Sequence, residues 1–200
     1  MTLAPAPSGR RERNKQAKLD RITRAAAALF AEHGVDDVTT QQIADAADIG
    51  TGTLFLYVRT KGELLLLVQN AAYAAALARG EAAAAAEADP VDAVLAILRP
   101  VVECNRTQVD NGRTYLREMV FGDPEEPHHR EALAIVARTE AAVAGVLRRD
   151  ERLDSAAAAT LAHVVSAIML VSMATTASAA AGVEDVVRDV RTQVTAVLHR

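Results

Sequence analysis

The chain has 200 residues, of which 50% are hydrophobic, and it carries 22 Lys and Arg against 26 Asp and Glu for a net charge of −4. This composition excludes disorder of the whole chain. The single Cys excludes both a disulfide framework and a multi-cysteine zinc or iron–sulfur site. The opening MTLAPAPSGR lacks the continuous apolar stretch of a signal peptide, so we expect a cytoplasmic protein.

Charge is spread unevenly along the chain. Residues 1–62 hold nine Lys and Arg against seven Asp and Glu, and seven of these cations precede residue 25. Residues 63–200 hold 13 Lys and Arg against 19 Asp and Glu. A basic leader on an acidic body indicates a polyanionic partner for one end only, the alternative being a solvated charged face without a partner. We expect residues 1–14 to form a flexible basic arm.

Apolar residues at helical spacing predict a first helix over residues 15–33, which Gly34 ends. Thr39 and Gln42 have the spacing of a capping box, which predicts that a short helix opens after Thr39 and runs over 40–47. The turn at 48–50 separates it from a second short helix over 51–58.

Further capping and turn signals predict only helices in the rest of the chain. Thr60 with Glu63 repeats the capping-box spacing, Asp89-Pro90 has the N-cap and N1 pattern, Pro100 predicts a kink, and Asn111-Gly112 predicts a turn. The fold class is therefore all-α, with about nine helices. The helices expected after residue 60 span 61–87, 90–109, 113–121, 127–149, 155–181 and 183–198.

Residues 155–183 contain no Asp, Glu, Lys or Arg, a length that raises the question of a membrane span. Many Ala, Ser and Thr make the run only mildly hydrophobic, and a basic flank is missing, so we expect no membrane contact and a helix buried on all sides by protein. Together with the amphipathic helix over 183–198, it predicts subunit pairing. The expected dimer contacts are Leu161, Val165, Ile168, Val187, Val190 and Val194.

The short helices over 40–47 and 51–58, joined by a tight turn, have the lengths of a helix-turn-helix. A plain three-helix corner without a ligand is the alternative. The run Ile43-Ala44-Asp45-Ala46-Ala47-Asp48-Ile49-Gly50-Thr51-Gly52-Thr53-Leu54-Phe55-Leu56-Tyr57-Val58, followed by Thr60-Lys61-Gly62-Glu63-Leu64, resembles the DNA-binding domain of TetR-family (tetracycline-repressor-like) transcriptional regulators. The resemblance covers roughly residues 18–68 and is specific for that domain alone.

This resemblance implies an all-helical homodimer in which residues 15–62 bind a double-stranded DNA operator. Residues 63–200 would then form a helical domain for dimerisation, through the two C-terminal helices, and for sensing a small molecule. The DNA contacts carried over by position are Thr40, Gln41, Thr51, Gly52, Thr53, Phe55, Tyr57 and Lys61.

The chain departs from the family pattern at Gly50, Thr51, Phe55 and Leu56, where hydrogen-bond donors and a cation are commonly found. We therefore expect weaker phosphate anchoring by the recognition helix, and we expect the leader to compensate by binding the DNA backbone or a minor groove. The cations concerned are Arg10, Arg11, Arg13, Lys15 and Lys18.

For the C-terminal domain the sequence indicates a mostly apolar cavity with few polar groups, which favours a hydrophobic or amphiphilic effector. The alternative for each candidate is an ordinary position in the hydrophobic core, without a role in ligand binding. The candidates for ligand binding are Tyr73, Asn105, Gln108, Tyr115, Met119, Phe121, His163, Met169 and Met173, with Cys104 beside them.

The polar run 125–131 contains two adjacent His residues that would point about 100° apart on a helix, so we expect a solvated loop and no metal site. Catalytic and cofactor motifs are not recognisable, and we expect neither an enzyme nor a cofactor. The sequence therefore predicts a repressor that a small ligand releases from a near-palindromic operator. The alternatives are a ligand-activated regulator of the same family, or a helical dimeric binder or enzyme that does not bind DNA.

Overall fold

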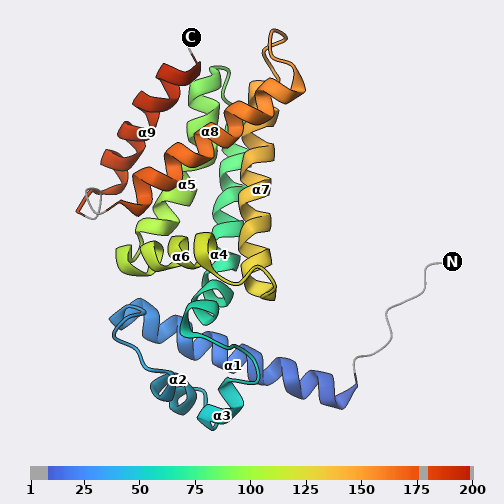
Figure 1. Ribbon diagram of the computed structural model, residues 1–200, viewed down its shortest axis with the longest axis vertical. Coiled ribbons are helices and arrows are strands. Elements are labelled where there is room, and N and C mark those ends of the chain that lie inside the picture. The colour runs from blue at the N-terminus through green and yellow to red at the C-terminus, as the bar shows by residue number, and fades with distance from the viewer. Residues whose placement is uncertain (1–8, 176–179, 199–200) are drawn as a thin grey trace, which may run out of the picture.

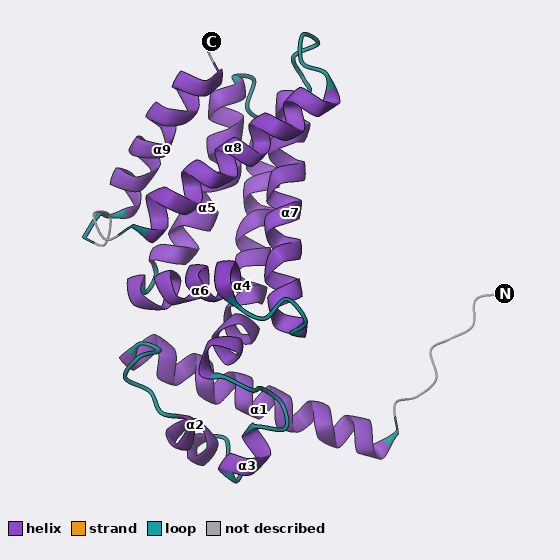
Figure 2. Cartoon of the chain, viewed as in Figure 1, coloured by secondary structure: helices purple, strands orange, loops and turns teal. Residues whose placement is uncertain are grey.

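The computed structural model describes residues 9–175 and 180–198, and within those ranges it contains nine helices and no strand. The all-α class is therefore confirmed, and Figure 2 shows helices joined by short loops. The helices are α1 Arg10–His33, α2 Thr40–Ala46, α3 Thr51–Leu54, α4 Lys61–Ala84, α5 Pro90–Arg106, α6 Val109–Phe121, α7 Pro127–Leu147, α8 Ser155–Ala174 and α9 Val183–Leu198.

Figure 1 shows an elongated molecule with two helical parts. Helices α1, α2 and α3 form a small unit at one end, and α4 leads from it into a larger body that contains α5 to α9. The N-terminal three-helix unit and the C-terminal helical domain thus have the expected arrangement, with α6 lying across the junction between them.

Helix α1 begins at Arg10, five residues earlier than expected, so residues 10–14 are helical rather than part of a flexible arm. Strong helix formers such as Arg, Lys and Gln continue the helix beyond its buried face, because exposed positions need only propensity and not packing. Residues 1–8 of the expected arm lie outside the described residues. The buried residues of α1 are Ile22, Ala26 and Phe30, and the helix ends at Gly34, whose φ of 79° an L side chain rarely adopts.

The two short helices pack around a tight turn. The Thr39 capping box at the start of α2 is confirmed: the Thr39 side chain accepts a hydrogen bond from the Gln42 backbone N–H, and the Gln42 side chain accepts one from the Thr39 backbone N–H. Asp48 adopts φ 53°, the left-handed conformation expected for this turn. Helix α3 ends at Leu54, earlier than predicted, and residues 55–57 continue as a turn.

The turn predicted at Asn111-Gly112 is wrong, because both residues lie in the first turns of α6. The Gln108 side chain caps this helix by accepting a bond from the Asn111 backbone N–H. Gly112 is needed for close packing and not for a turn: a Cβ at this position would clash with the backbone carbonyl of Asn105 at the end of α5. Tertiary packing therefore overrides the turn preference of the Asn-Gly pair.

Helix α8 is not buried on all sides, contrary to the expectation. It is long and apolar enough to cross a membrane by length and composition, yet only 33% of its most apolar window is buried within one chain. Val164 and Val171 are exposed on it. The predicted end of this helix at 181 is wrong, since α8 stops at Ala174; residues 176–179 lie outside the described residues.

Four of the six residues expected at a dimer interface are buried within a single chain. Val165, Val187, Val190 and Val194 pack into the hydrophobic core, where α9 covers α5 and α8. They cannot also present a surface to a partner, so this part of the expectation is corrected. Leu161 and Ile168 are only partly buried.

Candidate nucleic-acid interface and internal cavity

An open groove of about 1030 Å3 separates the N-terminal half of α1 from the α3 segment. The α1 side of the groove carries cations, and the α3 side carries polar and apolar side chains. Its lining is Arg10, Arg11, Glu12, Asn14, Lys15 and Lys18 from α1, with Thr53, Leu56 and Tyr57 opposite. Arg13 lies on the same helix but outside this lining. A groove with cations on one wall and an exposed recognition segment on the other suits a polyanion such as DNA.

The surface of the α3 segment is exposed and unusually apolar. Leu56 is 81% exposed and Phe55 48% exposed, so neither side chain contributes much to the core. Gly50 and Gly52 have open space around them, with no atom within 4 Å of a Cβ built on either. Large apolar groups in water at this point indicate a surface that another molecule covers.

The helix-turn-helix is held together by polar contacts across its own surface. The Thr51 hydroxyl donates to Gln41 Oε1 over 2.5 Å, and Gln41 Nε2 donates to Asp45 Oδ1 over 2.8 Å. Thr40 is partly buried at the start of α2. The first bond joins α3 to α2, and the two bonds together engage two of the residues expected to contact DNA, Gln41 and Thr51.

Lys61 makes hydrogen bonds within the protein. Its ammonium donates to the backbone carbonyls of Asp36 and Val38, both over 3.1 Å, and so fastens the start of α4 to the loop between α1 and α2. Two of its three donors are therefore engaged inside the protein. Any contact of Lys61 with a phosphate would use the remaining donor.

A second site, a cavity of about 300 Å3, lies inside the C-terminal body between α4, α5, α6, α7 and α8. Six of the nine residues expected to bind a ligand line it: Tyr73, Tyr115, Met119, His163, Met169 and Met173. The rest of its lining includes Thr139 and Glu140 of α7 and Ser166 of α8. Glu140 was missed by sequence reasoning, because a Glu on an otherwise ordinary amphipathic helix carries no distinguishing signal.

Three expected ligand residues do not reach this cavity. Asn105 stands behind it and donates to the Tyr73 hydroxyl over 3.0 Å, and Gln108 is occupied as the cap of α6. Phe121 is 82% exposed and lines a separate open groove of about 620 Å3 beside α6 and α8. Cys104 is half-buried and lies outside the cavity lining.

The tyrosine wall of the cavity is held from behind by amides. The rings of Tyr73 and Tyr115 are stacked with centroids 4.2 Å apart. The Tyr115 hydroxyl donates to Asn70 Oδ1, and Asn70 Nδ2 donates onward to the His128 carbonyl and to Glu131. Burial raises the pKa of both tyrosines well above the ordinary value, so both are neutral phenols.

Helix α6 connects the cavity to the helix-turn-helix unit. It carries Tyr115 and Met119 in the cavity wall and, one turn earlier, the buried Asn111. Asn111 Nδ2 donates to the Phe30 carbonyl over 2.7 Å, and its Oδ1 accepts from the Val35 backbone N–H over 2.6 Å. One side chain therefore joins α6 to the C-terminal end of α1.

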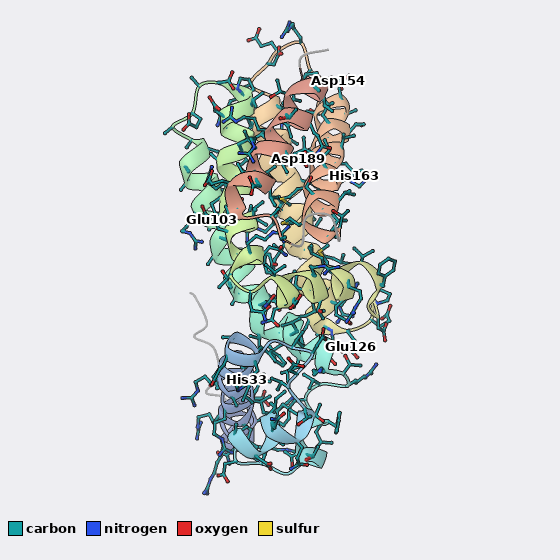
Figure 3. All side chains as sticks on the ribbon, turned by 90° about the vertical axis from the view of Figure 1, so that its left-hand side faces the viewer. His33, Glu103, Glu126, Asp154, His163 and Asp189 are labelled. Atoms are coloured by element: carbon teal, nitrogen blue, oxygen red, sulfur yellow. The ribbon has the colours of Figure 1, made fainter. Side chains whose placement is uncertain are left out.

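A charged cluster forms a second connection at the junction. Arg59 pairs with Glu126 at 2.8 Å and with Asp123 at 3.6 Å, and its backbone N–H donates to Glu63 over 2.6 Å. Figure 3 places Glu126 at the boundary between the two helical parts. Burial, reinforced by the adjacent Glu126 carboxyl, raises the pKa of Glu63 from 4.5 to about 7, against the opposing effect of the Arg59 backbone bond.

Because the pKa of Glu63 is higher in the folded protein than in the unfolded chain, its stabilising contribution is present below about pH 4.5 and is lost as the pH rises to about 7. We expect Glu63→Gln to remove this loss of stability at higher pH, because Gln does not ionise. The Gln side chain keeps an oxygen that accepts the Arg59 backbone N–H. Its stability relative to wild type should rise by about 1–3 kcal/mol between pH 4.5 and pH 8, measured by urea unfolding. Glu87→Gln, at an exposed position, is the control, and a Glu63→Gln difference that does not change with pH would contradict the assignment.

The expectation of a solvated loop at 125–131 is wrong for its two His residues, since α7 begins at Pro127 and includes both. His129 is buried, with Nε2 2.9 Å from the Met119 carbonyl, because the start of α7 packs against the end of α6. In the described part of the chain, no group of three or more His, Cys, Asp or Glu residues could hold a metal ion.

Comparisons with known proteins agree with this arrangement. Residues 22–68 match the family model of the bacterial regulatory proteins of the tetR family. The chain is 28% identical over 163 residues, 82% of its length, to the HTH-type transcriptional regulator TcmR of Streptomyces glaucescens, and it spans 65% of the length of that relative.

Solved structures share the fold over nearly the whole chain. The TetR-family regulator PfmR of Thermus thermophilus is 24% identical, with a TM-score of 0.60 over 90% of this chain and 98% of that one. FadR of the same organism, a TetR-family repressor solved with lauroyl-CoA, is 22% identical, with a TM-score of 0.69 over 90% and 92%. Residues 22–68 therefore match the DNA-binding domain described by the tetR family model, and the chain as a whole shares the fold of solved TetR-family regulators.

Proposed function

We propose that the protein is a cytoplasmic repressor that binds a near-palindromic DNA operator as a homodimer and is released by a small hydrophobic or amphiphilic molecule. The observation that carries this proposal is the groove between α1 and α3, with four cations on one wall and Thr53, Leu56 and Tyr57 on the other. Thr53, Phe55 and Tyr57 would face bases in the major groove, where Thr and Phe can contact a thymine methyl. The cations of α1 would bind the flanking phosphates.

The proposed ligand response follows from the course of α6. A molecule entering the cavity presses on Tyr115 and Met119, and the same helix holds α1 through Asn111. A ligand that prefers one position of α6 therefore shifts the orientation of the helix-turn-helix unit. In a dimer, such a shift changes the distance between the two recognition segments and weakens binding to half-sites about 34 Å apart.

The proposed dimer uses the exposed face of α8. Val164 and Val171 lie on this face beside the exposed Ala167, and the helix carries no Asp, Glu, Lys or Arg. A second copy covering this face would remove from water the apolar surface that a single chain leaves open. The charged outer face of α9 would then lie at the rim.

The proposed effector class rests on the cavity lining, which is mainly Tyr, Met, Leu, Ile, Val and Ala. A fatty acyl thioester was found with the repressor FadR, which has the same fold. The residues that line the cavity of this chain decide which apolar molecules fit it.

The experiment that tests DNA binding is selection of bound duplexes from a random pool, followed by titration of the enriched sequence. We expect an inverted repeat to be selected. Gly52→Glu should weaken binding by about 100-fold, because the new carboxylate faces phosphates while open space around Gly52 leaves the fold intact. Ala83→Glu, an equal charge change at the far end of α4, should leave affinity unchanged. Equal binding by both variants, or no enriched sequence, would refute the proposal.

A further inference from the structure

The internal cavity is mostly apolar, and its polar lining residues are Tyr73, Tyr115, Thr139, Glu140, His163 and Ser166. Among the described residues that line it, Glu140 carries the only carboxylate, and there is no Lys or Arg. The two tyrosine hydroxyls do not add a polar group to its interior, because they are engaged with Asn70 and Asn105 behind the wall. The Thr139 hydroxyl donates to the Ile135 carbonyl of its own helix.

Glu140 lies at the edge of the cavity, where it meets His163 of α8. His163 Nδ1 is 2.9 Å from Glu140 Oε1, and the two side chains are 76% and 29% exposed, respectively. Figure 3 shows His163 on the outer surface of the C-terminal body, which agrees with its high exposure. A polar contact with one partner largely in solvent contributes little to stability, so a ligand can replace His163 at small cost.

We propose that this cavity binds an organic cation, an amine with an apolar ring-bearing body whose ammonium group pairs with Glu140. The body would lie against the stacked tyrosines, with Met119, Met169 and Met173 adapting to its outline, since thioethers pack favourably at ring edges. This inference names the ligand class of the cavity described above. It rests on the proposed function only in expecting that ligand binding releases the protein from its operator.

Electrostatics disfavours the other charge types. A carboxylate or phosphate at the Glu140 edge of the cavity would approach that carboxylate with no Lys or Arg among the described lining residues to neutralise it. The buried Arg106 guanidinium, which donates to the Met173 carbonyl, lies behind the lining and not in it. A neutral molecule gains the apolar contacts but only a hydrogen bond at Glu140. A cation gains the same contacts and a charge interaction that is stronger at the cavity edge than in open water.

The test uses three probes that share one body and differ in one end group: 4-phenylbutylamine, 4-phenylbutanol and 4-phenylbutanoate. Calorimetric titration of the DNA-free protein should show the amine binding about tenfold tighter than the alcohol, with the carboxylate weakest. Glu140→Gln should abolish the preference for the amine while leaving the affinity for the alcohol within about twofold. His163→Ala should keep that preference, because it removes only a competing partner of Glu140.

Glu103→Gln is the matched control, an exposed carboxylate that Figure 3 shows across the C-terminal body from His163. Absence of amine binding, equal binding of the three probes, or an unchanged preference in Glu140→Gln would overturn the proposal. Amine binding through Glu140 that leaves operator affinity unchanged would instead refute ligand release in the proposed function. Operator release by a compound that ignores Glu140 would leave the proposed function intact and refute this inference.

Discussion

Replacing Arg11, Lys15 and Lys18 together by Ala should reduce the salt dependence of operator binding by a slope of about 3 per protomer, with roughly a hundredfold loss of affinity at low salt. These cations line the groove opposite the α3 segment, and each phosphate they neutralise releases condensed counterions. All three are exposed on α1, and Ala favours helix, so the fold should be retained. Titrations at several salt concentrations measure both quantities.

A matched control removes the same charge elsewhere. Arg138, Arg152 and Arg188 are exposed on the C-terminal domain, and replacing them together by Ala should leave the salt slope unchanged. If both triple variants lower the slope equally, only net charge matters and the groove is not the contact surface. A groove variant with wild-type slope would show that the DNA backbone is bound by other residues.

Replacing Asn111 by Leu should destabilise the protein by about 2–3 kcal/mol, because it leaves the buried Val35 N–H without its acceptor. The Phe30 carbonyl loses the Asn111 amide but keeps its bond from the Gly34 backbone N–H, which limits the cost. For a chain of this length we expect the melting temperature to fall by about 5–10 °C. Calorimetry measures the fall.

Amide hydrogen exchange separates a local effect from a general one. Asn111→Leu should accelerate exchange of the Val35 amide, relative to wild type, at least about tenfold more than it accelerates exchange of amides in the middle of α4. The reason is that the Val35 N–H has lost its acceptor. Arg117→Leu, at an exposed position on the same helix, is the control for adding an apolar side chain to α6. Equal melting temperatures for the two variants would show that Asn111 does not hold α6 to α1.

Local sequence signals were sufficient for the helix-turn-helix. The Thr39 capping box, the left-handed Asp48 and the end of α1 at Gly34 all depend on residues within a few positions of each other. Such contacts form in the same way wherever the segment lies, so the pattern predicts them directly. The errors in this unit, an α1 that starts earlier and an α3 that ends earlier, concern helix ends, where the free energy of one more turn is small.

The sequence by itself determined the all-helical class, the position of the two short helices and six of the residues of the cavity wall. Only the tertiary structure decided which groups meet from distant parts of the chain: Asn111 with α1, Arg59 with Glu126, and Glu140 with His163. It also decided that the valines of α9 serve the core and leave part of α8 exposed. The spacing of hydrophobic residues shows that a helix face will be buried but does not specify what covers it, because the burial of apolar area is not directional. A hydrogen bond, in contrast, requires one particular partner in one geometry.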